Sequence, residues 1–304
     1  MQQTLVLNFD SLVKMQKTLN RILANEDINF LVTNRIPRIA ATHFVGWLSH
    51  IQSPRLASLL IWIWRGFSEL DLTESKQQHF RSLNECFTRE LVDGSRPFCD
   101  DPGTVASPSD GIVGAFGHID DGTLIQAKGF PYTLRDLTQS PHLASDFQSG
   151  YFVTLRLTSS MYHRFHAPVD LSVSKVTYIS GDTWNVNPIA LKRVERLFCK
   201  NERAIIEATL SQSVQRIAII PVAAVLVASI RLHFVNVLLH LRYKGANPIH
   251  SKASLSRGEE MGWFEHGSTI ILLFPKGYRL LSSLGTGSKV KAGQAILEAF
   301  EVLP

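Results

Sequence analysis

The first third of the chain carries apolar residues at helical spacing. Residues 11–24 place their leucine, isoleucine and methionine side chains on one face, and Asp10 is the predicted cap. A second apolar stretch runs from about Ile39 to Ile51. The third, Ser53 to Phe67, opens on a Ser-Pro start signal and repeats apolar positions at three- and four-residue intervals. Helices are therefore predicted for all three stretches.

After Pro97 the pattern changes to short apolar runs separated by Gly, Asp and Asn turns, which is typical of strands. Just before this change, a capping-box pattern from Ser82 to Glu85 predicts a short helix through Phe87 and Leu91. Strands are predicted at Gly111–Phe116, Thr123–Ala127, Tyr151–Leu157, Ser172–Ile179, Arg203–Leu210, Arg216–Ile230, Phe234–Leu241, Ser268–Phe274 and Lys289–Phe300.

A helical region followed by a β-rich body is an α+β arrangement. We place the domain boundary after residue 96, which gives a helical, basic region at 1–96 and a β-rich catalytic domain at 97–304. Two short strands around a Gly turn between Lys289 and Leu297 predict a terminal hairpin that closes a small barrel. The predicted body is therefore barrel-like.

The charge distribution adds a candidate surface to this picture. The net charge is +5, and the residues before Gly66 hold seven basic and three acidic side chains, so most of the excess is N-terminal. Such an excess fits an anionic partner, and it fits an ordinary solvated face equally well. The Ser53–Phe67 helix, with Arg55 and Arg65 near its ends, can lie in a bilayer interface or pack on the domain behind it.

The cysteines and the apolar runs bear on the compartment. Cys86, Cys99 and Cys199 are odd in number and lack metal-ligand spacing, which indicates reduced thiols in a cytoplasmic chain. The N-terminus shows no basic region followed by an apolar one, so no signal peptide is predicted. The longest uncharged apolar run, Ile217–Ile230, contains Pro221 and falls short of the ~20 residues of a membrane span, so it is predicted as buried strands.

Two histidines three residues apart, His163 and His166, follow the predicted strand Tyr151–Leu157. Imidazole titrates near neutral pH, so either side chain suits general acid–base chemistry. A metal site would need a third ligand, and the sequence has no second HxxH, no HExxH and no cysteine pair. Purely structural histidines are the other alternative.

The tripeptide Gly267-Ser268-Thr269 precedes the apolar run Ile270–Phe274. Glycine exposes its carbonyl and tolerates unusual dihedral angles, so the Ser268 hydroxyl is a candidate for chemistry on its own backbone. Such tripeptides are more often simple turns, and so are Asp-Gly pairs such as Asp110-Gly111. An aspartate is also what fixes the tautomer of a catalytic histidine, so Ser268, a histidine and Asp110 can form a triad.

With these motifs together, the chain resembles bacterial phosphatidylserine decarboxylases, which are pyruvoyl-dependent, membrane-associated enzymes. The resemblance covers roughly residues 38–304, and the first 37 residues fall outside it. One departure is His266, where the best-known members carry leucine before Gly-Ser. The motifs that carry the resemblance are Asn84–Leu91, Ser107–Gly111, Gln126–Gly129, Tyr162–His166, Gly181-Asp182 with Val186-Asn187, Phe198–Arg203 and Gly262–Thr269.

The resemblance implies that the chain cleaves itself between Gly267 and Ser268. The Ser268 hydroxyl attacks the Gly267 carbonyl, with His166 as the base and Asp110 as its partner. The resulting ester eliminates, and hydrolysis leaves a pyruvoyl group at position 268. The products are a β chain of residues 1–267 and an α chain of residues 268–304.

The resemblance further implies that the pyruvoyl carbonyl forms a Schiff base with the serine amine of phosphatidylserine and accepts electrons as CO₂ leaves. The product is phosphatidylethanolamine. His163 is the candidate for assisting decarboxylation or protonation. The expected partners are phosphatidylserine, an anionic membrane surface, the two processed chains and a homodimer, with no nucleic acid and no metal. The expected location is peripheral, on the cytoplasmic side of the cell membrane.

Two other functions fit parts of the sequence. An ordinary serine hydrolase would keep Ser268 as a free nucleophile in an uncut chain, although the Gly-x-Ser-x-Gly elbow is absent. A membrane-docked binding module with a lipoyl-like barrel would need no chemistry at Ser268, and it would leave Asp110 and His166 as turn and core residues.

Overall fold

The computed structural model describes residues 25–126, 130–226, 229–265 and 268–300. The helices are Glu26–Asn34 (α2), Arg38–Ser49 (α3), Pro54–Phe67 (α4), Leu83–Phe87 (α5), Leu134–Thr138 (α6), Pro141–Asp146 (α7), Pro188–Leu191 (α8) and Leu197–Lys200 (α9). The strands are Thr104–Ala106 (β1), Gly111–His118 (β2), Thr123–Ile125 (β3), Pro131–Thr133 (β4), Tyr151–Leu157 (β5), Arg164–His166 (β6), Leu171–Ile179 (β7), Arg203–Leu210 (β8), Arg216–Ala223 (β9), Ser229–Leu232 (β10), Val237–His240 (β11), Ile249–His250 (β12), Ser254–Leu255 (β13), Glu260–Phe264 (β14), Ser268–Phe274 (β15), Tyr278–Leu280 (β16), Lys289–Val290 (β17) and Ala295–Ala299 (β18).

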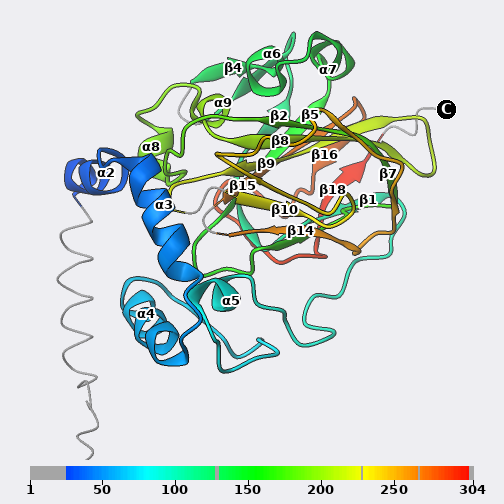
Figure 1. The fold of residues 1–304 in the computed structure, drawn as a ribbon. Coiled ribbons are helices and arrows are strands. Elements are labelled where there is room, and N and C mark those ends of the chain that lie inside the picture. Colours follow the sequence, from blue (N-terminus) through cyan, green and yellow to red (C-terminus); the bar gives the residue numbers. More distant parts are fainter. Residues whose placement is uncertain (1–24, 127–129, 227–228, 266–267, 301–304) are drawn as a thin grey trace, which may run out of the picture.

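A long antiparallel sheet forms the centre of the body, in the order β12-β7-β8-β9-β15-β5-β2-β17, and β13 also pairs with β7. A second sheet, β11-β10-β14-β6, packs on one face of it, whereas α6 and α7 cover the other face (Figure 1). Every residue of β15 is buried, because β9 and β5 flank the strand and a packed layer covers each face. The strand that begins at Ser268 is therefore central to the fold.

Side chains of β15 alternate between two apolar cores, as the period of a strand requires. Ile270 and Leu272 enter the core between the two sheets. Ile271 and Leu273 enter the core beneath the helices. Because both faces are buried, the strand appears in the sequence as one uninterrupted apolar run.

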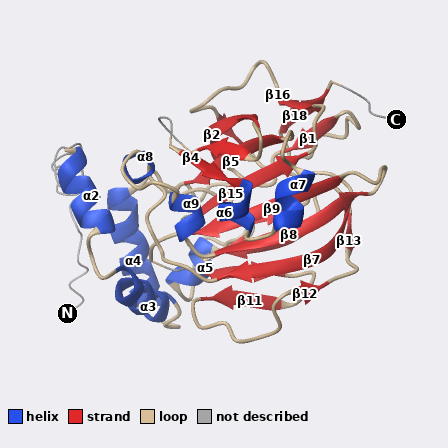
Figure 2. Cartoon of the chain, turned by 90° about the horizontal axis from the view of Figure 1, so that it is seen from above, coloured by secondary structure: helices blue, strands red, loops and turns tan. Residues whose placement is uncertain are grey.

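The N-terminal helices α2, α3 and α4 lie together at one side of the sheet body (Figure 2). The Ser53 side chain caps α4 by accepting a hydrogen bond from the Leu56 N–H at 3.4 Å. Trp64 of α4 stacks on Phe87 of α5, with ring centroids 5.5 Å apart, which ties the helices to the body. Within the described part of the chain, no helix has both the length and the apolar character needed to cross a bilayer.

Most of the predicted elements are confirmed. The strands Tyr151–Leu157, Arg203–Leu210 and Ser268–Phe274 have the predicted bounds, and the Ser53–Phe67 stretch is helical after its cap. The long run Arg216–Ile230 is divided between β9 and the start of β10. The helix after Ser82 ends at Phe87, earlier than predicted. The predicted helix at 11–24 lies outside the described residues, and α2 was not predicted.

The α+β class is confirmed, but the barrel-like body is wrong. Among the described residues no sheet closes on itself. The two tail strands belong to different sheets, because β17 pairs with β2 whereas β18 pairs with β1 and β16. Gly293, between them, has a φ of +87°, and a Cβ there would lie 2.3 Å from the Pro97 carbonyl oxygen. The turn therefore packs against the loop before β1, and the chain leaves the main sheet.

Candidate active site around Ser268

Ser268 is the first residue of β15 and pairs with Ala223 of β9 on one side and Leu157 of β5 on the other. Its side chain is 0% exposed, and its Oγ has no hydrogen-bond partner among the described residues. A wholly buried hydroxyl in this state is uncommon, because the desolvation of the group is not compensated. The predicted acyl donor Gly267 and the unusual His266 lie outside the described residues.

Asp110 directly precedes β2, and a bidentate ion pair holds its carboxylate. Nε and Nη2 of Arg96 each donate to it at 2.7 Å, and the Ala292 N–H donates at 2.9 Å. Arg96 also contacts Glu74 at 2.7 Å. Charge-assisted pairs of this geometry are strong and directional. Asp110 is therefore fixed in position by Arg96.

His166, in β6, is held at both ring nitrogens. Its Nδ1 lies 2.9 Å from the Gly258 carbonyl oxygen, so Nδ1 carries the hydrogen and donates it. The Tyr162 hydroxyl, 3.0 Å from Nε2, donates to the lone pair of that nitrogen. Burial lowers the pKa of His166, although the Gly258 hydrogen bond and the charges of Glu260 and Asp110 oppose this shift. His166 is therefore a neutral imidazole at pH 7, with its basic nitrogen on Tyr162.

His163 is 1% exposed and lies just before β6, with its ring 4.0 Å from that of Phe87. Its Nδ1 donates to the Met161 carbonyl oxygen at 2.8 Å, and its own carbonyl accepts the Phe264 N–H at 3.0 Å. Phe264 ends β14, the strand that leads into the predicted cleavage segment. His163 thus lies beside the end of β14 that is nearer to Ser268 along the chain, whereas His166 pairs with Glu260 at the other end.

The structure brings the predicted residues to one end of the central sheet but links only some of them. Asp110 acts on His166 through its charge, because it contributes to the pKa of that ring. In the described ranges, no hydrogen bond joins Asp110 to His166, or Ser268 to either of them. The roles of these residues remain predictions.

Two further residues of the site were not predicted. Arg96 pairs with Asp110, and Tyr162 hydrogen-bonds to His166. Tyr162 belongs to the quoted histidine motif, so its position was visible although its bond was not. Arg96 stands in a loop 14 residues before Asp110, and no spacing indicates that contact. Both line a cavity of about 560 Å³, together with Asp110, Arg89, Lys289 and Lys291.

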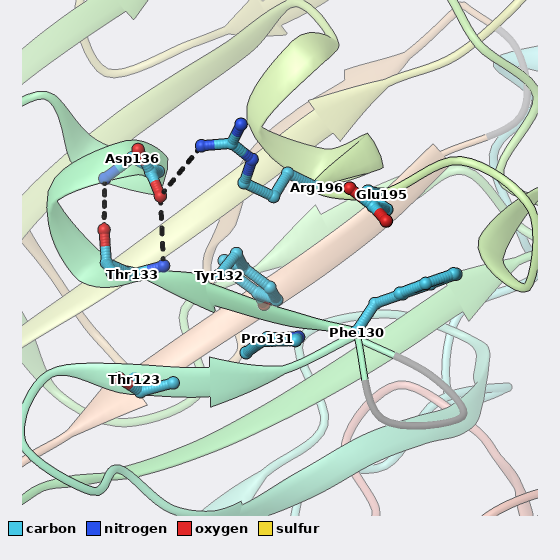
Figure 3. A pocket seen from close by; sticks show the side chains of 8 residues that line it. All are labelled: Thr123, Phe130, Pro131, Tyr132, Thr133, Asp136, Glu195 and Arg196. Carbon is cyan, nitrogen blue, oxygen red and sulfur yellow. Dashed lines mark hydrogen bonds and ion pairs between the residues drawn. The ribbon is translucent and has the colours of Figure 1, made fainter.

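Another cavity, of about 540 Å³, lies between the β3–β4 hairpin and the chain around α6 and α9 (Figure 3). Asp136 forms a capping box with Thr133, and Arg196 approaches the Asp136 carboxylate at 3.7 Å. None of the predicted site residues lines this cavity. In the part of the chain that is described, no three His, Cys, Asp or Glu side chains gather as metal ligands would.

An α+β fold with a buried serine at the head of a central strand, and a neutral histidine near by, indicates an enzyme rather than a binding module. The family model described as phosphatidylserine decarboxylase matches residues 83–298. The chain therefore belongs to the phosphatidylserine decarboxylase family, and the resemblance seen in the motifs is confirmed.

Curated relatives extend this match to most of the chain. The phosphatidylserine decarboxylase proenzyme of Haemophilus influenzae is 33% identical over 86% of this chain and 92% of its own length. The proenzyme of Yersinia enterocolitica is 33% identical over 88% of this chain and 95% of its own. That of Vibrio campbellii is 35% identical over 79% and 87%.

Proposed function

We propose that this chain decarboxylates phosphatidylserine to phosphatidylethanolamine, using a pyruvoyl group made from Ser268 when the Gly267–Ser268 bond is cleaved. One observation carries the proposal: the Ser268 hydroxyl is wholly buried, has no hydrogen-bond partner among the described residues and heads a central strand. A nucleophile for an external ester needs access to solvent, whereas a nucleophile for its own backbone does not. Burial therefore favours self-processing over the serine-hydrolase alternative.

The surroundings of Ser268 fit a chain that is cut and stays assembled. The α chain, residues 268–304, would begin with β15, which pairs along its length with β9 and β5. Its later strands β16 and β18 pair with each other, and β18 also pairs with β1. Cleavage before Ser268 would remove one peptide bond and none of these pairings. The pyruvoyl carbonyl would supply the electron-accepting group for loss of CO₂.

In the cleavage, the Ser268 oxygen bonds to the Gly267 carbonyl carbon and the peptide C–N bond breaks. His166 takes the hydroxyl proton and then gives it to the departing amine nitrogen of residue 268. Its lowered pKa keeps it in the basic form at neutral pH. Its Nε2 must first release the Tyr162 hydroxyl. Asp110, held by Arg96, stabilises the charge that His166 gains.

His163 has a separate role in turnover, next to the substrate carboxyl group. Its Nδ1–H is engaged with the Met161 carbonyl, so Nε2 is the atom that exchanges protons in the neutral ring. The Phe87 ring packs on this imidazole and restricts its orientation.

A membrane-facing surface completes the proposal. Large apolar side chains are exposed along α2, α3 and α4, and Trp47 is the most exposed of these at 64%. We place this surface in the cytoplasmic interface of the cell membrane, where apolar side chains and nearby arginines are both favourable. The exposed apolar residues of α2, α3 and α4 are Ile28, Leu31, Val32, Ile39, Phe44, Trp47, Leu59 and Ile63.

The purified full-length chain is expected to convert phosphatidylserine in vesicles to equal amounts of phosphatidylethanolamine and CO₂. Intact-mass measurement should find a fragment of 37 residues, 268–304, with a pyruvoyl N-terminus. Quantifying the lipid product and the fragment in one sample tests the two halves of the proposal together. An uncut chain that hydrolyses esters would point to a serine hydrolase.

Replacing both Phe44 and Trp47 with serine is expected to weaken binding to anionic vesicles by about 100-fold. Each aromatic side chain that leaves water contributes on the order of 1.5–3 kcal/mol, and part of that is realised at an interface. Vesicle co-sedimentation measures the change. The matched control replaces Val92 and Val214, which are exposed but belong to none of these helices. Equal loss in both double variants would contradict a specific membrane surface.

A further inference from the structure

Glu202 is a buried acid that the proposed chemistry does not use. It directly precedes β8, and its side chain is 0% exposed. Among the described residues, its carboxyl group has no partner of good hydrogen-bond geometry, and its polar neighbour is the Tyr178 hydroxyl of β7. A buried, unpaired carboxylate is costly, so this arrangement calls for either a neutral carboxyl group or a functional reason.

The strand register places Glu202 in the same transverse row as Ser268. The Ala223 N–H donates to the Glu202 carbonyl at 2.8 Å, which continues the β8–β9 pairing, and Ala223 in turn pairs with Ser268. Directly opposed residues of antiparallel strands point to the same face. Ala223 belongs to the core between the two sheets, so all three side chains lie on that face.

Ala223 presents only a methyl group between Glu202 and Ser268. Two strand spacings separate the backbones by roughly 10 Å. From its Cα, an extended glutamate side chain spans roughly half of this distance. An extended Glu202 side chain would therefore carry its carboxyl group over Ala223, towards position 268.

Burial raises the pKa of Glu202 to about 8, and the nearby Tyr178 hydroxyl opposes this shift. The Tyr178 hydroxyl is also buried, and burial together with the neighbouring Glu202 raises its own pKa. Glu202 therefore holds a proton at neutral pH. Because its pKa lies near the working pH, it can both give up that proton and recover it.

We infer that Glu202 is the proton donor of the Ser268 site. The inference rests on the proposed decarboxylation. As the C–C bond to the leaving CO₂ breaks, its electron pair stays with the substrate α-carbon. The Glu202 O–H bond then breaks and a C–H bond forms at that carbon. Glu202 becomes a carboxylate and takes a proton from solvent before the next turnover. His163 is left to assist the loss of CO₂.

The test compares Glu202→Gln with the wild-type chain in the full-length protein. The variant should be cut at Ser268 to the same extent by intact mass, because Glu202 takes no part in the cleavage. Its turnover should fall by about 10²-fold or more, the usual contribution of a general acid. The turnover rate of the wild-type enzyme should also fall above about pH 8. The residual rate of the variant should show no such fall in its pH profile.

A readout independent of activity uses uncut chains that carry Ser268→Ala. Difference infrared spectroscopy should find a protonated carboxylic acid at neutral pH, and Glu202→Gln should remove its carbonyl band. The folded pKa exceeds the unfolded one, so Glu202 favours the fold most at low pH and this contribution is lost as pH rises towards about 8. The Tm of the chain with Glu202 should therefore fall more steeply over this range than the Tm of the glutamine variant.

Glu207→Gln is the matched control, because Glu207 lies on β8, the strand that Glu202 precedes, but pairs with Lys175 at 2.7 Å. It should leave cleavage, turnover and the infrared band unchanged. Glu202→Asp keeps the acid on a shorter side chain, so it should recover part of the turnover that glutamine loses. Wild-type turnover in a cut Glu202→Gln chain, or no band at neutral pH, would overturn the inference. Failure of the wild-type chain to form phosphatidylethanolamine would instead overturn the proposed function.

Discussion

Replacing Ser268 with alanine is expected to give an uncut chain with no measurable decarboxylation. The substitution removes the oxygen that attacks Gly267 and the atoms from which the pyruvoyl group would be made. It should not harm the fold. The Ser268 Oγ is buried and unpaired among the described residues, so its loss should raise the free energy of unfolding by ~1 kcal/mol. Inactivity without destabilisation is the expected signature.

Thr269 supplies a closely matched control for this variant. Its Oγ1 is also buried without a hydrogen-bond partner in the described part of the chain, but the side chain faces the opposite side of the sheet. Thr269→Val keeps the shape and removes the hydroxyl, so this chain should be cut and active. Intact mass, product assay and thermal unfolding on both variants decide the matter. Cleavage of the Ser268→Ala chain at this bond, or an uncut valine variant, would contradict the role given to Ser268.

The central strands are the elements that the sequence predicts best, because their apolar pattern and their limits are both visible in the local sequence. Ser268–Phe274 is buried on both faces and bounded by Gly and Pro, so its apolar run and its limits coincide. By contrast, α2 packs Phe30 against the body but exposes its other large apolar residues, and it also contacts the body through polar pairs such as Asn29 and Asn187. Its pattern contains no buried stripe. The helix α2 is held by residues that are distant in the sequence, and the periodicity of its own residues does not predict those contacts.

Closure of the sheet was mispredicted for a related reason. Lys289–Val290 and Ala295–Ala299 have the spacing of a hairpin, but each strand pairs with a segment more than a hundred residues away. Which edge a short strand joins depends on edges left free elsewhere in the fold, and a hairpin pattern carries no information about them.

The motifs identified candidate site residues, but their partners come from the fold. Tyr162 covers the basic nitrogen of His166 and Arg96 holds Asp110, both through side-chain geometry. Glu202 shares a transverse row of the sheet with Ser268 only because Ala223 lies between them in register. Such relations join residues 4 to 66 positions apart, and they require the fold before they can be recognised.

Alanine at His166 and alanine at His163 are expected to separate the two stages of the chemistry. His166→Ala should slow cleavage by about 10²–10⁴-fold, because the chain loses its neutral base. His163→Ala should still be cut, and its turnover should fall by a similar factor. Time courses of fragment formation measure the first stage, and product formation by the cut protein measures the second. His118→Ala, at the exposed end of β2, should change neither stage.

Tyr162→Phe tests how His166 is released for this task. If the Tyr162 hydroxyl occupies the Nε2 lone pair until cleavage, its removal should leave the fragment forming at least as fast as in the wild-type chain. The rate of cleavage should stay level down to a pH below the usual imidazole value of ~6.5 and fall only as His166 is protonated, because burial lowers its pKa.

A His163→Ala chain that stays uncut would reverse the roles given to the two histidines. The base would then be the histidine beside Phe264, at the end of β14 that leads to Ser268.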